Sequence, residues 1–138
     1  MHYDFDPRRF LAPPQDIEEL YGSFLGSQRE NANAIVLVAE LDGDPVGYAF
    51  ATLEGNDYMS LRGPAGVLQD LVVDPARRGR GVGRLLLDAT LAALAARGVP
   101  RVVLSTAHRN EVAQRLFASA GFRRTMIEMT RELNDEKR

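Results

Sequence analysis

The segment that most constrains the fold is a buried strand that runs through alternating glycines into a helix. Residues 67–73 form a short apolar run that stops at Asp74-Pro75, which predicts a strand. Leucines at helical spacing over residues 81–97, followed by Gly98 and Pro100, predict a long helix. Three glycines stand at every second position at this junction: Gly79, Gly81 and Gly83. The lack of side chains there exposes the N–H groups of the first helical turn to a ligand.

The remaining patterns predict strands and helices on both sides of this junction. Further strands are predicted at residues 34–41, 46–53, 101–106 and 122–133, and further helices at residues 17–26 and about 110–120. The segment Asp42-Gly43-Asp44-Pro45 predicts the turn of an antiparallel hairpin. The order helix, three strands, helix, strand, helix, strand predicts an α/β fold with a mixed, mostly antiparallel central sheet flanked by helices.

Length and composition fit a single domain over residues 1–138. A chain of 138 residues leaves hardly any room for two domains, and its 45% apolar and 26% charged residues are typical of a globular protein. Residues 1–15 are expected to be irregular because of their prolines, and the tail over residues 134–138 is expected to be frayed. The absence of cysteine excludes a disulfide scaffold, a Cys-ligated metal and a Cys nucleophile. With only His2 and His108 as imidazoles, a multi-histidine site is excluded, so no metal is expected.

No targeting signal is visible in the sequence. No run approaches the ~18 apolar residues of a membrane span, and the N-terminus lacks the apolar core of a secretory signal. We therefore expect a cytoplasmic protein with no membrane partner. The formal net charge of −2 gives no general reason to expect a nucleic-acid partner.

The cations are concentrated next to the alternating glycines. Lys137 is the only lysine, and four arginines fall within residues 77–84. Guanidiniums, exposed amides and the positive end of a helix dipole together make a phosphate site. A flexible turn with solvated arginines is the alternative, and the strand-to-helix context favours the phosphate site. Nucleic-acid binding is disfavoured, because these arginines surround a glycine loop rather than line a helix face with aromatic residues.

Two common phosphate loops do not fit the segment. A Walker loop requires Gly-Lys-Ser/Thr, and no lysine is near; a dinucleotide fingerprint requires a third glycine where the chain has Leu86. The segment Arg78-Gly79-Arg80-Gly81-Val82-Gly83 does fit the pattern R-x-x-G-x-G. It resembles the coenzyme A pyrophosphate loop of the GNAT superfamily, the acetyl-CoA-dependent N-acetyltransferases.

A second segment strengthens this resemblance. Residues 110–122, NEVAQRLFASAGF, are similar to the family's N-x-x-A-x-x-L-Y-x-x-x-G-F helix and lie at the expected separation from the glycine loop. The resemblance covers about residues 34–133. It implies the GNAT fold and the transfer of an acetyl group from acetyl-CoA to a primary amine, on a small molecule or a protein, by direct attack in a ternary complex.

The resemblance also implies which residues hold acetyl-CoA. Amides of the glycine loop would bind the pyrophosphate, and the preceding strand would pair with the pantetheine arm, which requires the sheet to splay between Val73 and Arg101. One strand amide would polarise the thioester carbonyl. The Asn110 side chain would bind a pantetheine amide or cap its helix, two roles that are compatible. The implied cofactor-binding residues are Leu71, Val72, Val73, Arg78, Gly79, Arg80, Gly81, Val82, Gly83, Arg84, Asn110 and Phe117.

The sequence departs from the family at both acid–base positions. Many members carry a tyrosine that protonates the departing thiolate, where this chain has Phe117. Several members use a strand glutamate to take the proton from the amine, where this chain has Gln69. These departures fit an alternative function, an acyl-CoA-binding module that has lost turnover. Because a thiolate leaves readily and orientation alone supplies roughly 7–11 kcal/mol, we expect an enzyme.

Asp70 and His108 are the candidate catalytic residues. Asp70 stands beside Gln69 on the strand, where a structural role is the alternative, and His108 follows the fourth strand, where a solvent-exposed loop position is the alternative. Further candidates are Glu54 and Asp57 as bases and Tyr48 and Tyr58 as proton donors. A hydrolase triad of Ser105, His108 and Asp70 is rejected, because Ser105 lies within a predicted strand rather than on a nucleophile elbow.

The acceptor side and the C-terminal end carry two further expectations. The loop over residues 54–65 is the expected acceptor wall, because it joins the hairpin to the cofactor strand, and its two carboxylates favour a cationic amine. In residues 122–133, Ile127, Met129 and Leu133 alternate with polar residues, which predicts one half-exposed terminal strand. A single terminal strand leaves a sheet edge open, which a homodimer would cover.

Overall fold

The structure, a computed structural model, describes residues 32–134. These residues fall into two compact units, residues 32–105 and residues 106–134, and each is described by itself. The helix predicted at residues 17–26 and the irregular segment predicted at residues 1–15 lie outside the described residues, as does nearly all of the predicted frayed tail. The single domain over residues 1–138 stays a prediction.

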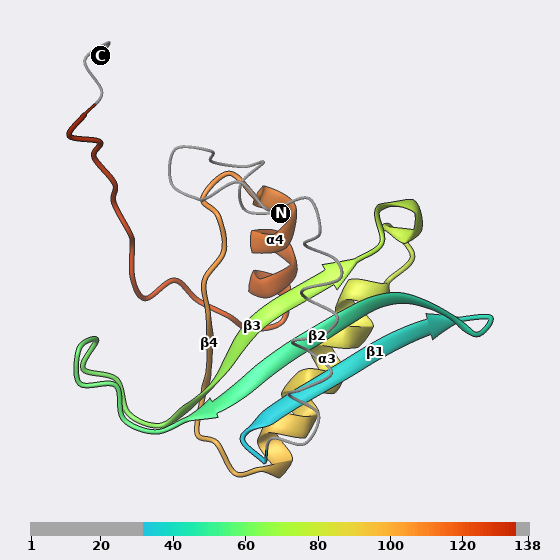
Figure 1. Ribbon diagram of the computed structural model, residues 1–138, viewed down its shortest axis with the longest axis horizontal. Helices are drawn as coiled ribbons and strands as arrows, with labels where there is room; N and C mark the ends of the chain where they lie inside the picture. The colour runs from blue at the N-terminus through green and yellow to red at the C-terminus, as the bar shows by residue number, and fades with distance from the viewer. Residues whose placement is uncertain (1–31, 135–138) are drawn as a thin grey trace. The chain divides into compact units, whose positions relative to one another are not determined.

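The first unit is built on a four-stranded mixed sheet with the order β1-β2-β3-β4 (Figure 1). Its strands are β1 (Ala34–Leu41), β2 (Asp44–Glu54), β3 (Ala65–Val73) and β4 (Val102–Leu104). The pairs β1–β2 and β2–β3 are antiparallel, and β4 runs parallel to β3. The predicted mixed, mostly antiparallel sheet is therefore confirmed. The fourth strand is shorter than the predicted 101–106, because only three of its residues pair with β3.

The hairpin between β1 and β2 turns on two residues rather than four. Asp42 and Gly43 have φ angles of 53° and 84°, as a tight hairpin turn requires at both central positions. Pro45 lies inside β2 opposite Glu40, next to a register shift between Ala39 and Glu40. The predicted turn was too long because Asp44 and Pro45 belong to β2. At these two residues β2 pairs with β1 alone, since its pairing with β3 begins at Gly47, and a proline is tolerated at such an edge position.

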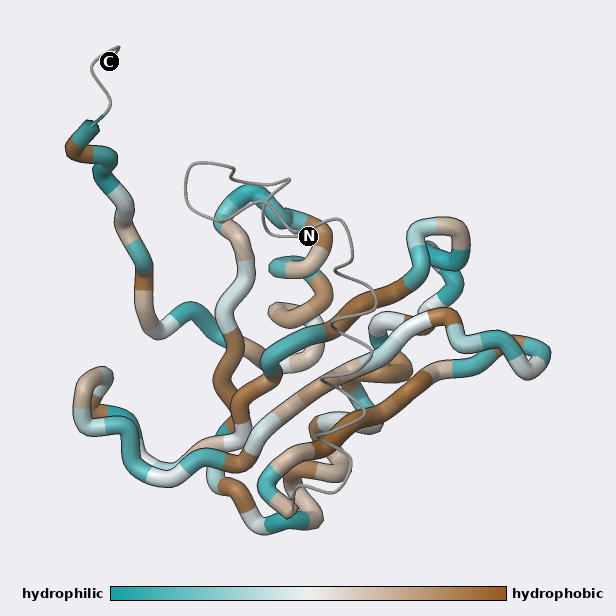
Figure 2. The backbone as a smooth tube through the Cα atoms, viewed as in Figure 1, coloured by the Kyte–Doolittle hydropathy of each residue, from teal (hydrophilic) through white to brown (hydrophobic). Residues whose placement is uncertain are grey.

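The helix α3 (Val82–Ala96) lies along one face of β1, β2 and β3 (Figure 1). Its side chains Leu86, Leu87 and Leu94 are buried, and the Thr90 hydroxyl donates to the Leu86 carbonyl at 2.7 Å. Figure 2 shows hydrophobic residues along these strands and α3, and mainly hydrophilic ones in the loop between β3 and α3. The predicted helix at residues 81–97 is confirmed, with Gly81 and Arg97 as its caps.

Two glycines allow close packing in the first unit, Gly66 between β3 and α3 and Gly47 between β2 and β3. A Cβ on Gly66 would lie 2.8 Å from Cδ2 of the buried Leu94, and a Cβ on Gly47 would lie 2.7 Å from the Val72 carbonyl oxygen. Gly47 stands opposite Val73, at the end of β3 that leads into the glycine loop. Packing at this end therefore sets the position of the loop.

The second unit contains one helix among its described residues, α4 (Glu111–Ser119). Gly121, with a φ of 96°, follows the helix, and the Phe117 and Phe122 rings meet edge to face with centroids 5.8 Å apart. The strand predicted at residues 122–133 is wrong: the segment has no regular secondary structure. Alternation predicts a strand only where one face is covered, and both of its faces are exposed; Ile127, Met129 and Leu133 are each more than 80% accessible. The homodimer inferred from that strand stays a prediction.

None of the helices in the described part of the chain is long and apolar enough to cross a membrane.

Candidate functional site

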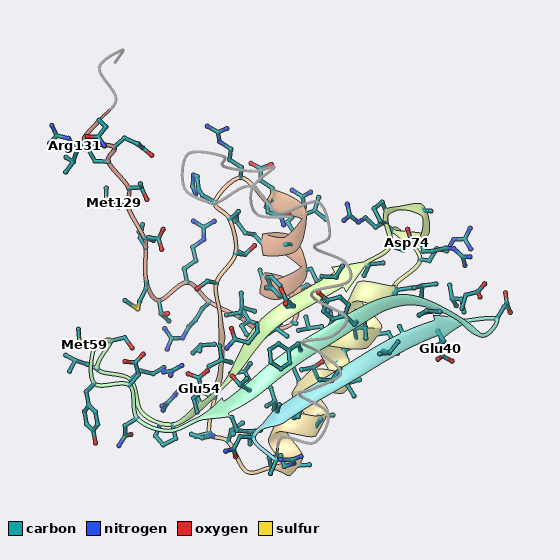
Figure 3. The ribbon with its side chains drawn as sticks, in the orientation of Figure 1. Glu40, Glu54, Met59, Asp74, Met129 and Arg131 are labelled. Carbon is teal, nitrogen blue, oxygen red and sulfur yellow. The ribbon has the colours of Figure 1, made fainter. Side chains whose placement is uncertain are left out.

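The loop between β3 and α3 is shaped by Asp74. The Asp74 Oδ1 accepts from the Ala76 amide at 3.1 Å and so caps a short 3-10 helix, η1 (Pro75–Arg77), which the sequence analysis did not predict. The Asp74 amide donates to the Val46 carbonyl at 2.8 Å, which ties the start of the loop to β2. Figure 3 shows Asp74 where β3 ends and the loop begins.

The glycines that follow turn the chain into α3 and leave its first amides open. Gly79 and Gly81 have φ angles of 83° and 81°, which side chains rarely allow. Apart from the adjacent residues, no described atom lies within 4 Å of the position of a Cβ on either glycine. Gly81 is the N-cap and provides no side-chain acceptor, and the first helical bond runs from the Leu85 amide to the Gly81 carbonyl at 3.0 Å. The amides of Val82 and Gly83 therefore have no intrahelical acceptor, and they form part of the positive end of the helix dipole.

Guanidinium groups stand beside these amides. Arg78 and Arg80 are exposed and form no ion pair with any residue that the structure describes. Arg84 is different, because its Nε lies 3.0 Å and 3.1 Å from the two carboxylate oxygens of Asp88, one helical turn ahead. The loop thus combines open amides, a helix terminus and two guanidiniums with no ion-pair partner within residues 32–134, which is a site for a phosphate anion.

The strands β3 and β4 separate just before this loop. They pair only from Gly66↔Val102 to Leu68↔Leu104, and β3 continues for five more residues along β2. The splay expected between Val73 and Arg101 does not begin at Arg101, whose carbonyl accepts from the Gly66 amide at 2.9 Å. Pairing between the two strands stops only after Leu68 and Leu104. Leu71 and Val73 pack against the core cluster of Val46, Ala49, Val82 and Leu86, whereas Val72 is 37% exposed.

A β-bulge marks the point at which the strands separate. Leu68 stands opposite Ala51 and Asp70 opposite Phe50, so Gln69 is an extra residue that no β2 residue faces in the strand register. The Gln69 Nε2 donates to Thr52 Oγ1 at 3.1 Å and to Glu54 Oε2 at 3.3 Å. The residue at which the resemblance implies a glutamate thus holds the carboxylate of a neighbouring strand.

Glu54 is the centre of a polar group that we call the Glu54 cluster, formed by Thr52, Glu54, Arg62 and Gln69. The Thr52 hydroxyl donates to Glu54 Oε2 at 2.8 Å, and Arg62 Nη2 forms an ion pair with Oε1 at 3.4 Å. The Glu54 side chain is 42% exposed, whereas that of Arg62 is 18% exposed. Glu54 is one of the bases predicted from the sequence, but its contact with Gln69 depends on the bulge, which has no signature in the sequence.

The two residues predicted as catalytic lie in different units. Asp70 is half-buried in the first unit, in register with Phe50. His108 is exposed in the second unit, where its main-chain carbonyl accepts from Gln114 Nε2 at 2.6 Å. Both roles stay predictions. Ser105 was predicted to lie within a strand, but it is exposed and comes just after the end of β4.

Asp57 and Tyr58 lie in the loop after β2. The Asp57 Oδ1 accepts from the amides of Met59 at 3.0 Å and Ser60 at 3.3 Å. Hydrogen bonding to Ser60 is the main cause that lowers the pKa of the Asp57 carboxyl. This carboxylate therefore stabilises the turn over residues 57–60, and it is poorly suited to take a proton. Tyr58 is 79% exposed, and its hydroxyl accepts from Asn56 Nδ2 at 3.4 Å.

In the second unit, Asn110 and Phe117 have clear structural roles. The Asn110 Oδ1 accepts from the Ala113 amide at 3.1 Å, so Asn110 is the N-cap of α4. Phe117 is buried against Phe122. A further role in binding a cofactor stays a prediction for both. No group of three or more His, Asp or Glu side chains within residues 32–134 could hold a metal ion.

Comparison with known proteins gives one consistent family. The sequence model of the Acetyltransferase (GNAT) family matches residues 2–122. A mycothiol acetyltransferase from Clavibacter michiganensis subsp. michiganensis is 41% identical over 104 residues, which cover 75% of this chain and 28% of that protein. The uncharacterized N-acetyltransferase YhfO from Bacillus subtilis is 28% identical over 117 residues, covering 83% of this chain and 75% of that protein. The chain spans less than a third of the length of the mycothiol acetyltransferases that it matches.

Solved structures share the fold. The aminoglycoside N-acetyltransferase AAC(6')-Iy, in complex with a bisubstrate analogue, matches with a TM-score of 0.70 at 20% identity, over 98% of this chain and 88% of that chain. The BH1408 protein from Bacillus halodurans, as a tetramutant, matches with a TM-score of 0.68 at 22% identity, over 88% of this chain and 97% of that chain. At these identities the likeness concerns the fold alone.

Proposed function

The chain belongs to the GNAT acetyltransferase family, and on that premise we propose that it transfers an acetyl group from acetyl-CoA to a primary amine. The observation that carries the proposal is the open N-terminus of α3, where Gly81 provides no side-chain cap and Arg78 and Arg80 stand unpaired among the described residues. A diphosphate supplies the anionic acceptors that this loop lacks.

The residues present fit acetyl-CoA. In the proposed complex the amides of residues 82–84 donate to the pyrophosphate, while Arg78 and Arg80 add charge-assisted contacts. The positive φ angles of Gly79 and Gly81, together with the open space where each Cβ would lie, let an anion approach the backbone. The loop is fixed to the sheet through Asp74 and Val46, so little ordering is needed on binding.

The splay between β3 and β4 provides the binding place for the pantetheine arm and the acetyl group of acetyl-CoA. An extended arm that pairs with residues 71–73 would run from the glycine loop toward Gln69, where β3 leaves β4. This is recognition by addition of a strand to an unpaired edge. Bound acetyl-CoA supplies an electrophilic thioester carbonyl, and a strand amide beyond Leu68 would polarise its oxygen.

The transfer proceeds by direct attack in a ternary complex. The neutral amine nitrogen forms a bond to the acyl carbon, the carbon–sulfur bond breaks, and the sulfur leaves as a thiolate that takes up a proton. Phe117 has no proton to give, so the proton comes from the amine or from water. Orientation of the two reactants carries most of the rate enhancement, on the order of 7–11 kcal/mol.

The related proteins support a small-molecule acceptor. Two of them are named for mycothiol and for an aminoglycoside, and one aminoglycoside acetyltransferase structure holds CoA-S-monomethyl-acetylneamine, which joins the two reactants in one molecule. The second candidate function is an acyl-CoA-binding module without turnover, which Gln69 and Phe117 favour because neither side chain titrates.

Calorimetric titration with acetyl-CoA and then with desulfo-CoA, followed by a thiol-release assay, tests the proposal. We expect both ligands to bind and thiol release to depend on an added amine. Binding without amine-dependent release would favour the binding module. The absence of binding by either ligand would contradict both functions.

A further inference from the structure

We propose that the Glu54 carboxylate binds the ammonium group of the acceptor and takes its proton, which makes Glu54 a catalytic residue and the substrate a cationic primary amine. This inference rests on the proposed function and adds the acceptor side of the same site. It is carried by the Glu54 cluster and by the position of that cluster next to the splay of the sheet.

The carboxylate is held in one orientation by side chains from three directions. Its Oε2 accepts from Thr52 Oγ1 at 2.8 Å and from Gln69 Nε2 at 3.3 Å, and its Oε1 lies 3.4 Å from Arg62 Nη2. Thr52 is on the same strand, Gln69 is on the bulge of β3, and Arg62 comes from the loop between them. Fixing the group in this way lowers the entropy cost of using it.

The carboxylate also remains available to a ligand. Each carboxylate oxygen offers about two acceptor positions, and among the described residues Oε1 contacts Arg62 alone, which leaves one of its positions open. The Glu54 side chain is 42% exposed, so a solute can reach it.

The position of the cluster matches the acyl end of the proposed acetyl-CoA site. Gln69 is the first residue of β3 beyond Leu68↔Leu104, where pairing with β4 stops, and its side chain contacts Glu54. Figure 3 shows Glu54 and Asp74 toward opposite ends of the β2–β3 pair. Asp74 follows Gln69 by five positions, which is roughly 17 Å at strand rise. An extended ligand bound at the glycine loop therefore directs its far end toward Glu54.

The proton balance of the step is complete with these groups. The ammonium pairs with the carboxylate and gives it one proton, which leaves a neutral amine. The nitrogen then attacks the thioester carbon, the carbon–sulfur bond breaks, and the second proton on nitrogen passes through water to the thiolate. Glu54 afterwards releases its proton to solvent, so one ammonium and one thioester yield an amide, a thiol and one proton.

The test uses four amines as probes: tyramine, putrescine, glucosamine and Nα-acetyl-lysine. Glu54→Gln retains the shape of the side chain but removes its charge. We expect kcat/KM for every probe that the wild-type protein acetylates to fall by about 100-fold, the lower end of what one acid or base contributes, with the Kd of acetyl-CoA unchanged. Glu54→Asp should retain part of the activity.

Glu40→Gln is the matched control, because Glu40 is an exposed carboxylate at the opposite end of the β1–β2 hairpin (Figure 3). It should leave kcat/KM unchanged, and all variants should show the circular dichroism and melting temperature of the wild type. Wild-type kcat/KM in Glu54→Gln would overturn this inference and leave the proposed function standing. Bound acetyl-CoA with no acetylation of any probe by the wild-type protein would contradict the proposed function and this inference together.

Discussion

The Gln69 amide nitrogen lies 3.3 Å from the Glu54 carboxylate, across a bulge that gives β3 one residue more than the facing stretch of β2. The contact joins the end of β2 to the residue at which β3 leaves β4. One extra residue therefore re-aims a side chain and places a carboxylate beside the diverging strands. The same strand leads at its other end into the open amides of the glycine loop.

Gly81→Glu should abolish acetyl-CoA binding. The new carboxylate would stand at the anion site, and its backbone would have to keep a φ of 81°. Gly81→Ala separates the two effects, because it carries the backbone strain of about 1–2 kcal/mol without the charge. We expect calorimetry to show weakened binding for Gly81→Ala and none for Gly81→Glu. Equal affinities in wild type and Gly81→Glu would show that the ligand binds elsewhere.

Arg78→Ala and Arg80→Ala should each weaken acetyl-CoA binding by roughly 10- to 100-fold, the value of one charged hydrogen bond. Because both guanidiniums are exposed, the loss should shrink as salt rises. Arg123→Ala is the control, since Arg123 is exposed in the extended segment after Gly121. Isothermal titration at low and high salt provides the measurement. A loss of the same size in the control would assign the effect to overall charge.

Asn110→Ala should destabilise the protein by about 1 kcal/mol, because the Ala113 amide loses its cap. Asn110→Asp keeps an acceptor for that amide but loses the side-chain N–H donors. If Asn110 also binds the pantetheine arm, Asn110→Asp should fold normally and bind acetyl-CoA roughly 2- to 10-fold less tightly. Chemical denaturation and calorimetry of both variants measure the two roles, and normal binding by Asn110→Asp would leave only the cap.

Gly47→Ala should reduce the free energy of unfolding by about 1–3 kcal/mol, the usual cost of overpacking. Its Cβ would lie 2.7 Å from the Val72 carbonyl oxygen, a backbone atom that moves only if β3 moves. Gly55→Ala is the matched control, with no atom within 4 Å of its Cβ, and should be neutral. Urea denaturation compares the two, and equal stability would mean that β2 and β3 do not approach as closely as described.

The Asp57 carboxyl should titrate at a lower pH than an aspartate in an unstructured peptide. The pKa of Asp57 is lowered chiefly by hydrogen bonding to Ser60, so the folded turn favours the ionised form. Its contribution to stability is complete above the unfolded pKa and disappears as the pH falls through the folded pKa. Carbon-13 NMR of the carboxyl group measures this directly, and a titration at the peptide value would contradict the turn geometry.

The sequence predicts the fold wherever a local pattern and its packing agree. The alternation and apolar runs of β1, β2 and β3 and the capped leucine face of α3 identify these elements within a few residues, because the residues that show the period are those that the core buries. Residues 122–133 also alternate, but nothing in the described chain covers Ile127 or Met129, so no strand forms there. An alternation of apolar and polar residues indicates a strand only when another part of the protein covers its apolar face.

One part of the candidate site could be predicted from the sequence, and the other part could not. The glycine loop is visible in the sequence, because its function depends on backbone conformation and charge at adjacent positions. The Glu54 cluster is not, because it depends on a register shift between Phe50 and Ala51 that no local pattern marks. Residues 17 positions apart, such as Thr52 and Gln69, meet only through strand pairing.

The most direct test of the account follows the backbone amides of the glycine loop by nitrogen-15 NMR during titration with desulfo-CoA. We predict that the amides of residues 79–84 show the largest chemical-shift changes, and that Gly81→Glu removes them. Changes confined to other parts of the chain, with the amides of residues 79–84 unmoved at saturation, would contradict the assignment of the loop as the coenzyme A site.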